Sequence, residues 1–140
     1  GELGKDTLCK IYKTQLDNLQ TQLDNLNKIL DQVKDIEKYG QEVTSSGAAS
    51  QDAKDKFKSL VQDLVNQSLE RNQALVHMAA TGILNRIQSS TNSDDDNKAI
   101  QFAVDRLADL IDHAGKILRN NENTLKDIGK MFADKNCPKQ

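Results

Sequence analysis

The chain contains little of what β-rich folds require. Among its 140 residues are one proline, seven glycines and no tryptophan, and aromatic side chains make up only 4%. A sandwich or a barrel needs many turns and many aromatic or β-branched strand residues, so the composition argues against both. It predicts an all-helical protein. The length fits a single domain, 1–140, that can bury a core without the help of a metal ion.

The chain also lacks a strong charge excess and a long apolar run. Lys and Arg number 19 against 21 Asp and Glu, and the net charge of −2 creates no field that would attract nucleic acid or an anionic membrane surface. No stretch approaches the roughly 18 apolar residues that a membrane-crossing helix needs. We therefore expect no nucleic-acid partner and no membrane insertion.

Motifs for catalysis and metal binding are missing as well. The sequence has no nucleophile elbow, no phosphate-binding glycine loop, no zinc pattern and no Glu-x-x-His pair of the di-iron kind. His113 follows Asp109 by four residues, but two ligands on one helix face do not make a metal site. His77 lies in an apolar run, where we expect a hydrogen-bonded core residue. The chain is predicted not to be an enzyme and to hold no cofactor.

The most regular feature that is present is an apolar seam. Six aliphatic residues recur at alternating spacings of three and four, namely Leu16, Leu19, Leu23, Leu26, Leu30 and Val33. The heptad QLDNLQT is nearly repeated by QLDNLNK, and the remaining faces of this helix are polar. Because isolated helices are marginal in water, the seam must pack against other helices.

The first helix is expected to run from Lys5 or Asp6 to about Tyr39. Gly40 is placed as its C-terminal cap, because glycine adopts the left-handed conformation that commonly ends a helix. The segment that follows, 41–50, is small and polar and is predicted to be a loop.

A second apolar periodicity follows Ser50, which is a suitable N-cap residue. It runs over 57–87 but falters at the polar stretch 70–73, where a break is expected. Residues 74–84, ALVHMAATGIL, are apolar on nearly every side. This pattern predicts a central helix enclosed by its neighbours, and the lining of a hydrophobic ligand site is the alternative.

The last helix is expected to begin at Ser93 and to end before Asn136. Ser93 is predicted to be the N-cap, with Asp94, Asp95 and Asp96 in the first turn, where carboxylates favour the helix dipole. A bend is predicted at three weak helix formers, Asn120, Asn121 and Asn123.

The two cysteines, Cys9 and Cys137, lie near opposite ends of the chain. They are either free thiols of a cytosolic protein or one disulfide of a secreted protein. Neither has an evident packing role in the helical core, which favours the disulfide and an extracellular location. A bridge that closes so long a loop contributes about 4 to 5 kcal/mol in the chain-entropy model. The glycosylation sequon at 66–68 is compatible with secretion.

The cysteines also constrain the number of helices. Three long antiparallel helices would leave Cys9 and Cys137 roughly 45 Å apart, whereas a disulfide tolerates at most about 7 Å between Cα atoms. An intrachain bridge needs an even number of passes, which a reversal at 70–73 supplies. We therefore predict an antiparallel bundle of four helices. Three long helices, which the periodicity alone favours, are the alternative, and they would leave free thiols or an interchain bridge in an antiparallel dimer.

Three classes of function follow from this scaffold. The first is a secreted protein that binds another protein through its irregular segments, 40–50 and 89–97, where Asp94, Asp95 and Asp96 are the candidate contact residues. The second is an amphipathic bundle that binds lipid. The third is a structural coiled-coil module, which the repeated heptads favour. The oligomeric state is open in all three.

Two terminal segments, LCKIYKTQLDNL and KNCPKQ, carry a resemblance to a known family. With the small size, the helical pattern and the terminal cysteines, they resemble the helical salivary proteins of blood-feeding arthropods, in particular the anopheline albicin and anophensin family. Members of that family interfere with the alternative complement pathway or the kallikrein-kinin contact system by binding proteins. The resemblance implies a secreted inhibitor whose partner is a host protein of one of these cascades. It assigns no individual binding residue.

Overall fold

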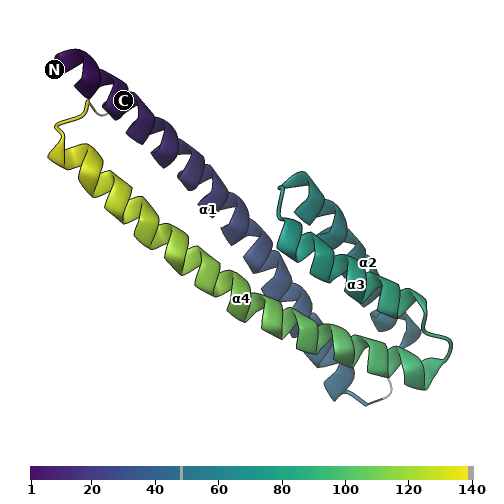
Figure 1. Ribbon diagram of the computed structural model, residues 1–140. Coiled ribbons are helices and arrows are strands. Elements are labelled where there is room, and N and C mark those ends of the chain that lie inside the picture. Colours follow the sequence, from purple (N-terminus) through teal and green to yellow (C-terminus); the bar gives the residue numbers. More distant parts are fainter. Residues whose placement is uncertain (48, 139–140) are drawn as a thin grey trace. The chain divides into compact units, whose positions relative to one another are not determined.

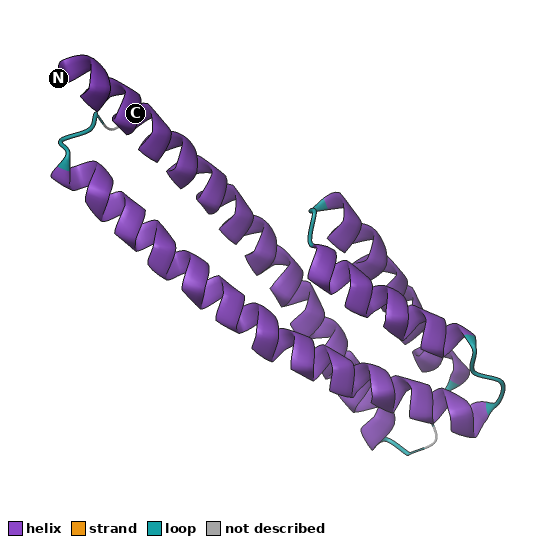
Figure 2. Cartoon of the chain, viewed as in Figure 1, coloured by secondary structure: helices purple, strands orange, loops and turns teal. Residues whose placement is uncertain are grey.

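The computed structural model describes residues 1–47 and 49–138. This part of the chain contains helices and no strand (Figure 2). The helices are labelled in Figure 1 as α1 (Glu2–Ser45), α2 (Gln51–Glu70), α3 (Ala74–Gln88) and α4 (Ser93–Asp134). α1 and α4 are in antiparallel contact, and so are α2 and α3. The prediction of an all-α, four-helix fold is confirmed, and the three-helix alternative is wrong.

The reversal between α2 and α3 occurs at the predicted polar turn. Asn72 has a φ of 59°, in the left-handed region that asparagine tolerates better than most side chains. The backbone N–H of Gln73 donates to the carbonyl oxygen of Ser68 at 2.8 Å, which closes the end of α2. This turn provides the even number of passes that an intrachain disulfide requires.

The predicted cap at Gly40 is wrong, because α1 continues to Ser45. Gly40 is buried, and a Cβ at this position would lie 2.7 Å from Phe57 Cε2 and 2.7 Å from Val104 Cγ2. Glycine is therefore needed here for the close approach of α2 and α4, and not to end the helix. The left-handed glycine is Gly47, with a φ of 80°.

The chain divides into two compact units. The terminal unit comprises Gly1–Asn27 and Lys116–Gln140, and the central unit comprises Lys28–Gly115. The terminal unit is built from parts of α1 and α4, whereas the central unit contains the remaining parts of these helices together with α2 and α3. Whether 1–140 behaves as a single domain stays a prediction.

The core of the central unit draws on all four helices. Its most deeply buried aliphatic and aromatic residues are Ile29, Val33, Ile36, Phe57, Val61, Leu64, Ile83 and Leu107. Each such side chain contributes about 1.5–3 kcal/mol through its burial. The part of the predicted seam that falls in this unit, Leu30 and Val33, is buried as expected.

A polar contact at the end of α2 holds α3 beside it. His77 Nδ1 lies 2.9 Å from the carbonyl oxygen of Val65, to which it donates, and Ser68 Oγ donates to the same oxygen at 3.1 Å. Ser68 is buried and His77 is half-buried. The predicted hydrogen bond of His77 is therefore confirmed, but the residue lies at the edge of the core and not within it.

The terminal unit has a smaller core. Cys9, Phe132 and Cys137 are buried, and Tyr12 and Leu16 pack against them. α4 continues through the three weak helix formers Asn120, Asn121 and Asn123 to Asp134, so they do not end the helix, and a bend there stays a prediction.

Candidate functional site

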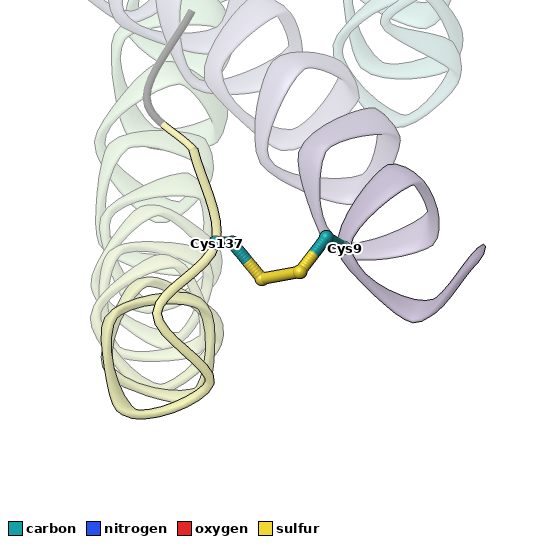
Figure 3. The surroundings of a disulfide bond; sticks show 2 residues. All are labelled: Cys9 and Cys137. Carbon is teal, nitrogen blue, oxygen red and sulfur yellow. A yellow bond between two sulfur atoms is a disulfide. The ribbon is translucent and has the colours of Figure 1, made fainter. Parts of the chain in front are cut away.

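The predicted disulfide is present in the terminal unit. Cys9 of α1 and Cys137, which follows α4, are bonded to each other with their Cα atoms 5.5 Å apart (Figure 3). Both residues are buried, so the bond is part of the small core of this unit. A buried bridge of this kind is typical of proteins that fold in an oxidising compartment.

The acidic run at the start of α4 is largely engaged within the chain. Arg86 Nη2 donates to Asp95 Oδ1 at 2.9 Å, and the backbone N–H of Thr91 donates to Asp95 Oδ2 at 3.3 Å. The hydrogen bond from Arg86, reinforced by its charge, lowers the pKa of Asp95 in spite of the opposing effect of partial burial. Asp95 therefore joins α4 to α3.

Asp96 belongs to a second cluster that ties α4 to α2. Lys54 is buried, and its Nζ donates to Ser93 Oγ at 3.0 Å and lies 3.7 Å from Asp96 Oδ2. Ser90 Oγ also donates to Asp96. A buried lysine needs such partners, because an uncompensated charge is costly away from water. Asp96 and Ser93 supply them.

The cap of α4 differs from the prediction by one residue. Asn92 Oδ1 accepts a hydrogen bond from the backbone N–H of Asp95 at 2.9 Å, so Asn92 caps the helix. Ser93, the predicted cap, is the first helical residue, and its hydroxyl is occupied by Lys54. At α2 the predicted cap is confirmed, since Ser50 Oγ accepts from the backbone N–H of Ala53 at 3.2 Å.

These hydrogen bonds and ion pairs involve two of the three aspartates that are predicted to contact a partner protein. Asp95 and Asp96 are half-buried and bonded within the chain, whereas Asp94 is exposed. A partner role for Asp94, Asp95 and Asp96 stays a prediction, and Asp94 is the best placed of the three. In the other candidate segment, residues 40–45 are helical, and residue 48 lies outside the described residues.

The structure reveals an exposed apolar surface on α3 that the sequence reasoning missed. Val76, Ala80 and Ile83 are buried, but Met78 is 72% exposed and Leu75 is 42% exposed. The prediction that α3 is enclosed by its neighbours is therefore wrong. Its apolar residues cover nearly the whole circumference of the helix, and neighbouring helices cover only one side.

A shallow groove of about 300 Å³ lies beside this surface. Leu75 and Ala79 line it from α3, and Arg106, Asp109, Leu110 and His113 line it from α4. Phe102, which is 41% exposed, lies one turn before Arg106, whose Cζ is 5.9 Å from the centre of the phenyl ring. We refer to Leu75, Met78, Ala79, Phe102 and Arg106 together as the α3–α4 face.

The α3–α4 face contains residue types that are common in protein interfaces. Aromatic residues, methionine and arginine, here Phe102, Met78 and Arg106, are enriched at the centres of such interfaces, and methionine adapts its shape to a partner. Asp109 and His113, singled out in the sequence as an isolated pair, line the groove and are exposed. In the described part of the chain, no three His, Cys, Asp or Glu residues lie close enough together to hold a metal ion.

No family model, no curated protein and no solved structure matches this chain significantly. Within residues 1–47 and 49–138, none of the helices combines the length and the apolar character that a bilayer-spanning helix needs.

Proposed function

We propose that the protein is a secreted, non-enzymatic inhibitor that binds a host plasma protein of the alternative complement pathway or of contact activation. The observation that carries the proposal is the α3–α4 face. A short helix exposes Met78 and Leu75, and Leu75 lines a groove together with Arg106. Exposed apolar groups gathered on one face of a chain with ample polar residues favour association with another protein.

The disulfide supports the extracellular part of the proposal. Reducing conditions in the cytosol would keep Cys9 and Cys137 as thiols, whereas secreted proteins retain such bridges. The core of the terminal unit contains both cysteines, so this unit depends on oxidation more than the central unit does. A protein that acts in plasma gains from a bridge that resists unfolding of its ends.

The choice of cascade follows from the resemblance of the segments LCKIYKTQLDNL and KNCPKQ to the albicin and anophensin family. Inhibition by binding also suits a groove that combines charged and apolar lining residues. Arg106 and Asp109 offer one cation and one anion to a partner, and Leu75 and Ala79 offer apolar contacts.

The direct test adds the oxidised chain to two plasma assays. One measures erythrocyte lysis by the alternative pathway, and the other measures kallikrein formation after contact activation. We expect one of them to be inhibited, and we expect the immobilised chain to retain a component of that cascade from plasma. If both cascades proceed at the rate of the untreated plasma and no component is retained, the proposal is wrong.

A further inference from the structure

The glycosylation sequon lies on α2 and presents an exposed asparagine. Asn66, Gln67 and Ser68 form the acceptor pattern, and no other asparagine of the chain is followed two positions later by serine or threonine. Asn66 is exposed, one turn before α2 ends at Glu70. The folded chain therefore has room for a bulky, solvated group on this side chain.

We propose that Asn66 carries an N-linked glycan that covers the neighbouring Leu69. The inference rests on the extracellular location in the proposed function, because such glycans are added in the oxidising compartment in which secreted proteins form their disulfides.

The transfer needs one co-reactant, an oligosaccharide carried by a lipid pyrophosphate. Asn66 Nδ2 forms a bond to the anomeric carbon of the oligosaccharide, and the bond between that carbon and the pyrophosphate oxygen breaks. The lipid pyrophosphate leaves, and the amide nitrogen loses one proton to a base of the transferase. Nothing is oxidised or reduced.

The packing of Ser68 determines when the transfer takes place. Ser68 is completely buried, and its hydroxyl donates to the carbonyl oxygen of Val65 at 3.1 Å and lies 3.3 Å from His77 Nδ1 of α3. The transferase needs access to this hydroxyl, so the glycan is added before α3 packs against α2. Because Cys137 is synthesised after both helices, the disulfide forms later than the sequon meets the enzyme.

An exposed leucine beside the acceptor supports a sugar at this position. Leu69 is 66% exposed and follows Asn66 by three residues, so the two side chains are neighbours on the surface of α2. The first sugar ring on Asn66 is within reach of Leu69 and packs its C–H groups on this side chain. The contact removes apolar surface of the leucine from water, which favours the glycosylated chain.

Mass mapping of the full-length chain, secreted from insect cells behind a cleaved leader peptide, tests the proposal. We expect a heavier species that peptide-N-glycosidase returns to the mass of the bare chain, with Asn66 converted to aspartate. Asn66→Gln changes an exposed side chain and should abolish the added mass. The control Asn18→Gln changes an exposed asparagine outside a sequon and should keep the added mass.

Thermal unfolding tests the contact with Leu69. Enzymatic removal of the glycan should lower the unfolding temperature of the natural chain, and the decrease should be smaller in Leu69→Gln, because the sugar loses its apolar neighbour. Equal decreases in the two chains would show that the glycan does not cover Leu69.

The outcomes separate this inference from the proposed function. A secreted chain that has the bridge between Cys9 and Cys137 but a bare Asn66 overturns the glycosylation and leaves the proposed inhibition as it stands. A chain that is glycosylated at Asn66 and inhibits neither plasma cascade overturns the proposed inhibition and supports the glycosylation.

Discussion

At the scale of single residues, Gly40 decides how closely α1, α2 and α4 approach in the central unit. The variant Gly40→Ala should lower the free energy of unfolding by about 1–3 kcal/mol, because the added methyl group would overlap Phe57 and Val104. Gly82 is the matched control, since a Cβ there meets no atom within 4 Å. Gly82→Ala should stabilise α3 by about 0.5–1 kcal/mol. Urea denaturation measures both effects, and equal effects of the two variants would contradict this account of Gly40.

Asp95 should make the stability of the central unit depend on pH. Because Arg86 lowers the pKa of Asp95 below its ordinary value of 3.8, the ionised carboxylate stabilises the folded chain. This contribution is fully present above pH 3.8 and is lost as the pH falls through the lower pKa of the folded state. The difference in stability between the natural chain and Asp95→Asn should therefore be larger at neutral pH than in acid.

The test of this prediction is acid titration of both chains, followed by circular dichroism under mild denaturant. Asp94→Asn, which changes the exposed neighbour, serves as the control and should follow the natural chain. If the difference in stability between Asp95→Asn and the natural chain stays constant down to the lowest pH of the titration, the contact with Arg86 contributes nothing to stability.

Predictions for single residues are correct where the residue that the side chain contacts is close in the sequence, and wrong where that residue is distant in the sequence. Ser50 caps α2 through the N–H of Ala53, three residues away, and this was predictable. The sequence predicts Ser93 as a cap, but its hydroxyl is bound by Lys54, 39 positions earlier. It predicts Gly40 as the residue that ends α1, whereas the side chains that require a glycine there lie on other helices.

At the scale of the elements, the periodicity of apolar residues predicts where the helices lie in the chain. It does not predict which faces of each helix are covered by neighbouring helices. The polar turn at 70–73 and the cysteine pair together predicted the division into α2 and α3. The sequence of α3, in contrast, suggested complete enclosure, because a helix that is apolar all round is usually buried. Hydropathy indicates which residues can be buried. Only the packing of neighbouring helices determines which of them are buried. The α3–α4 face was missed for this reason.

The disulfide should matter more for the terminal unit than for the central unit. The double variant Cys9→Ser and Cys137→Ser removes a link between residues 128 positions apart, which is worth about 4 to 5 kcal/mol in the chain-entropy model. The terminal unit has a small core of its own, so its amide hydrogens should exchange much faster in the variant. The amides of α2 and α3 should stay protected.

Hydrogen exchange followed by mass spectrometry of peptides resolves this prediction. The natural chain in oxidising and reducing buffer provides an internal control, because reduction should reproduce the effect of the double variant. Equal loss of protection in both units would contradict the view that the bridge acts mainly on the terminal unit.

At the scale of the whole molecule, the two cysteines predict that the number of helices is even. They do not predict that the chain divides into two units. The heptads of 16–33 run through the boundary between the units without a change of pattern. What changes is the number of helices that surround them, which depends on where α2 and α3 pack. That information lies in contacts between distant segments, and for this reason the division into two units could not be inferred from periodicity.

The proposed binding of a plasma protein by the α3–α4 face depends on Met78. The two methionines of the chain allow a matched test, because Met78 is 72% exposed on this face and Met131 is 50% exposed in the terminal unit. The decisive measurement is the concentration that half-inhibits the affected cascade for Met78→Lys, Met131→Lys and the natural chain. We expect Met78→Lys to be weaker by about thirty-fold, as for loss of a central interface residue, and Met131→Lys to match the natural chain. Equal inhibition by Met78→Lys and the natural chain would contradict the account.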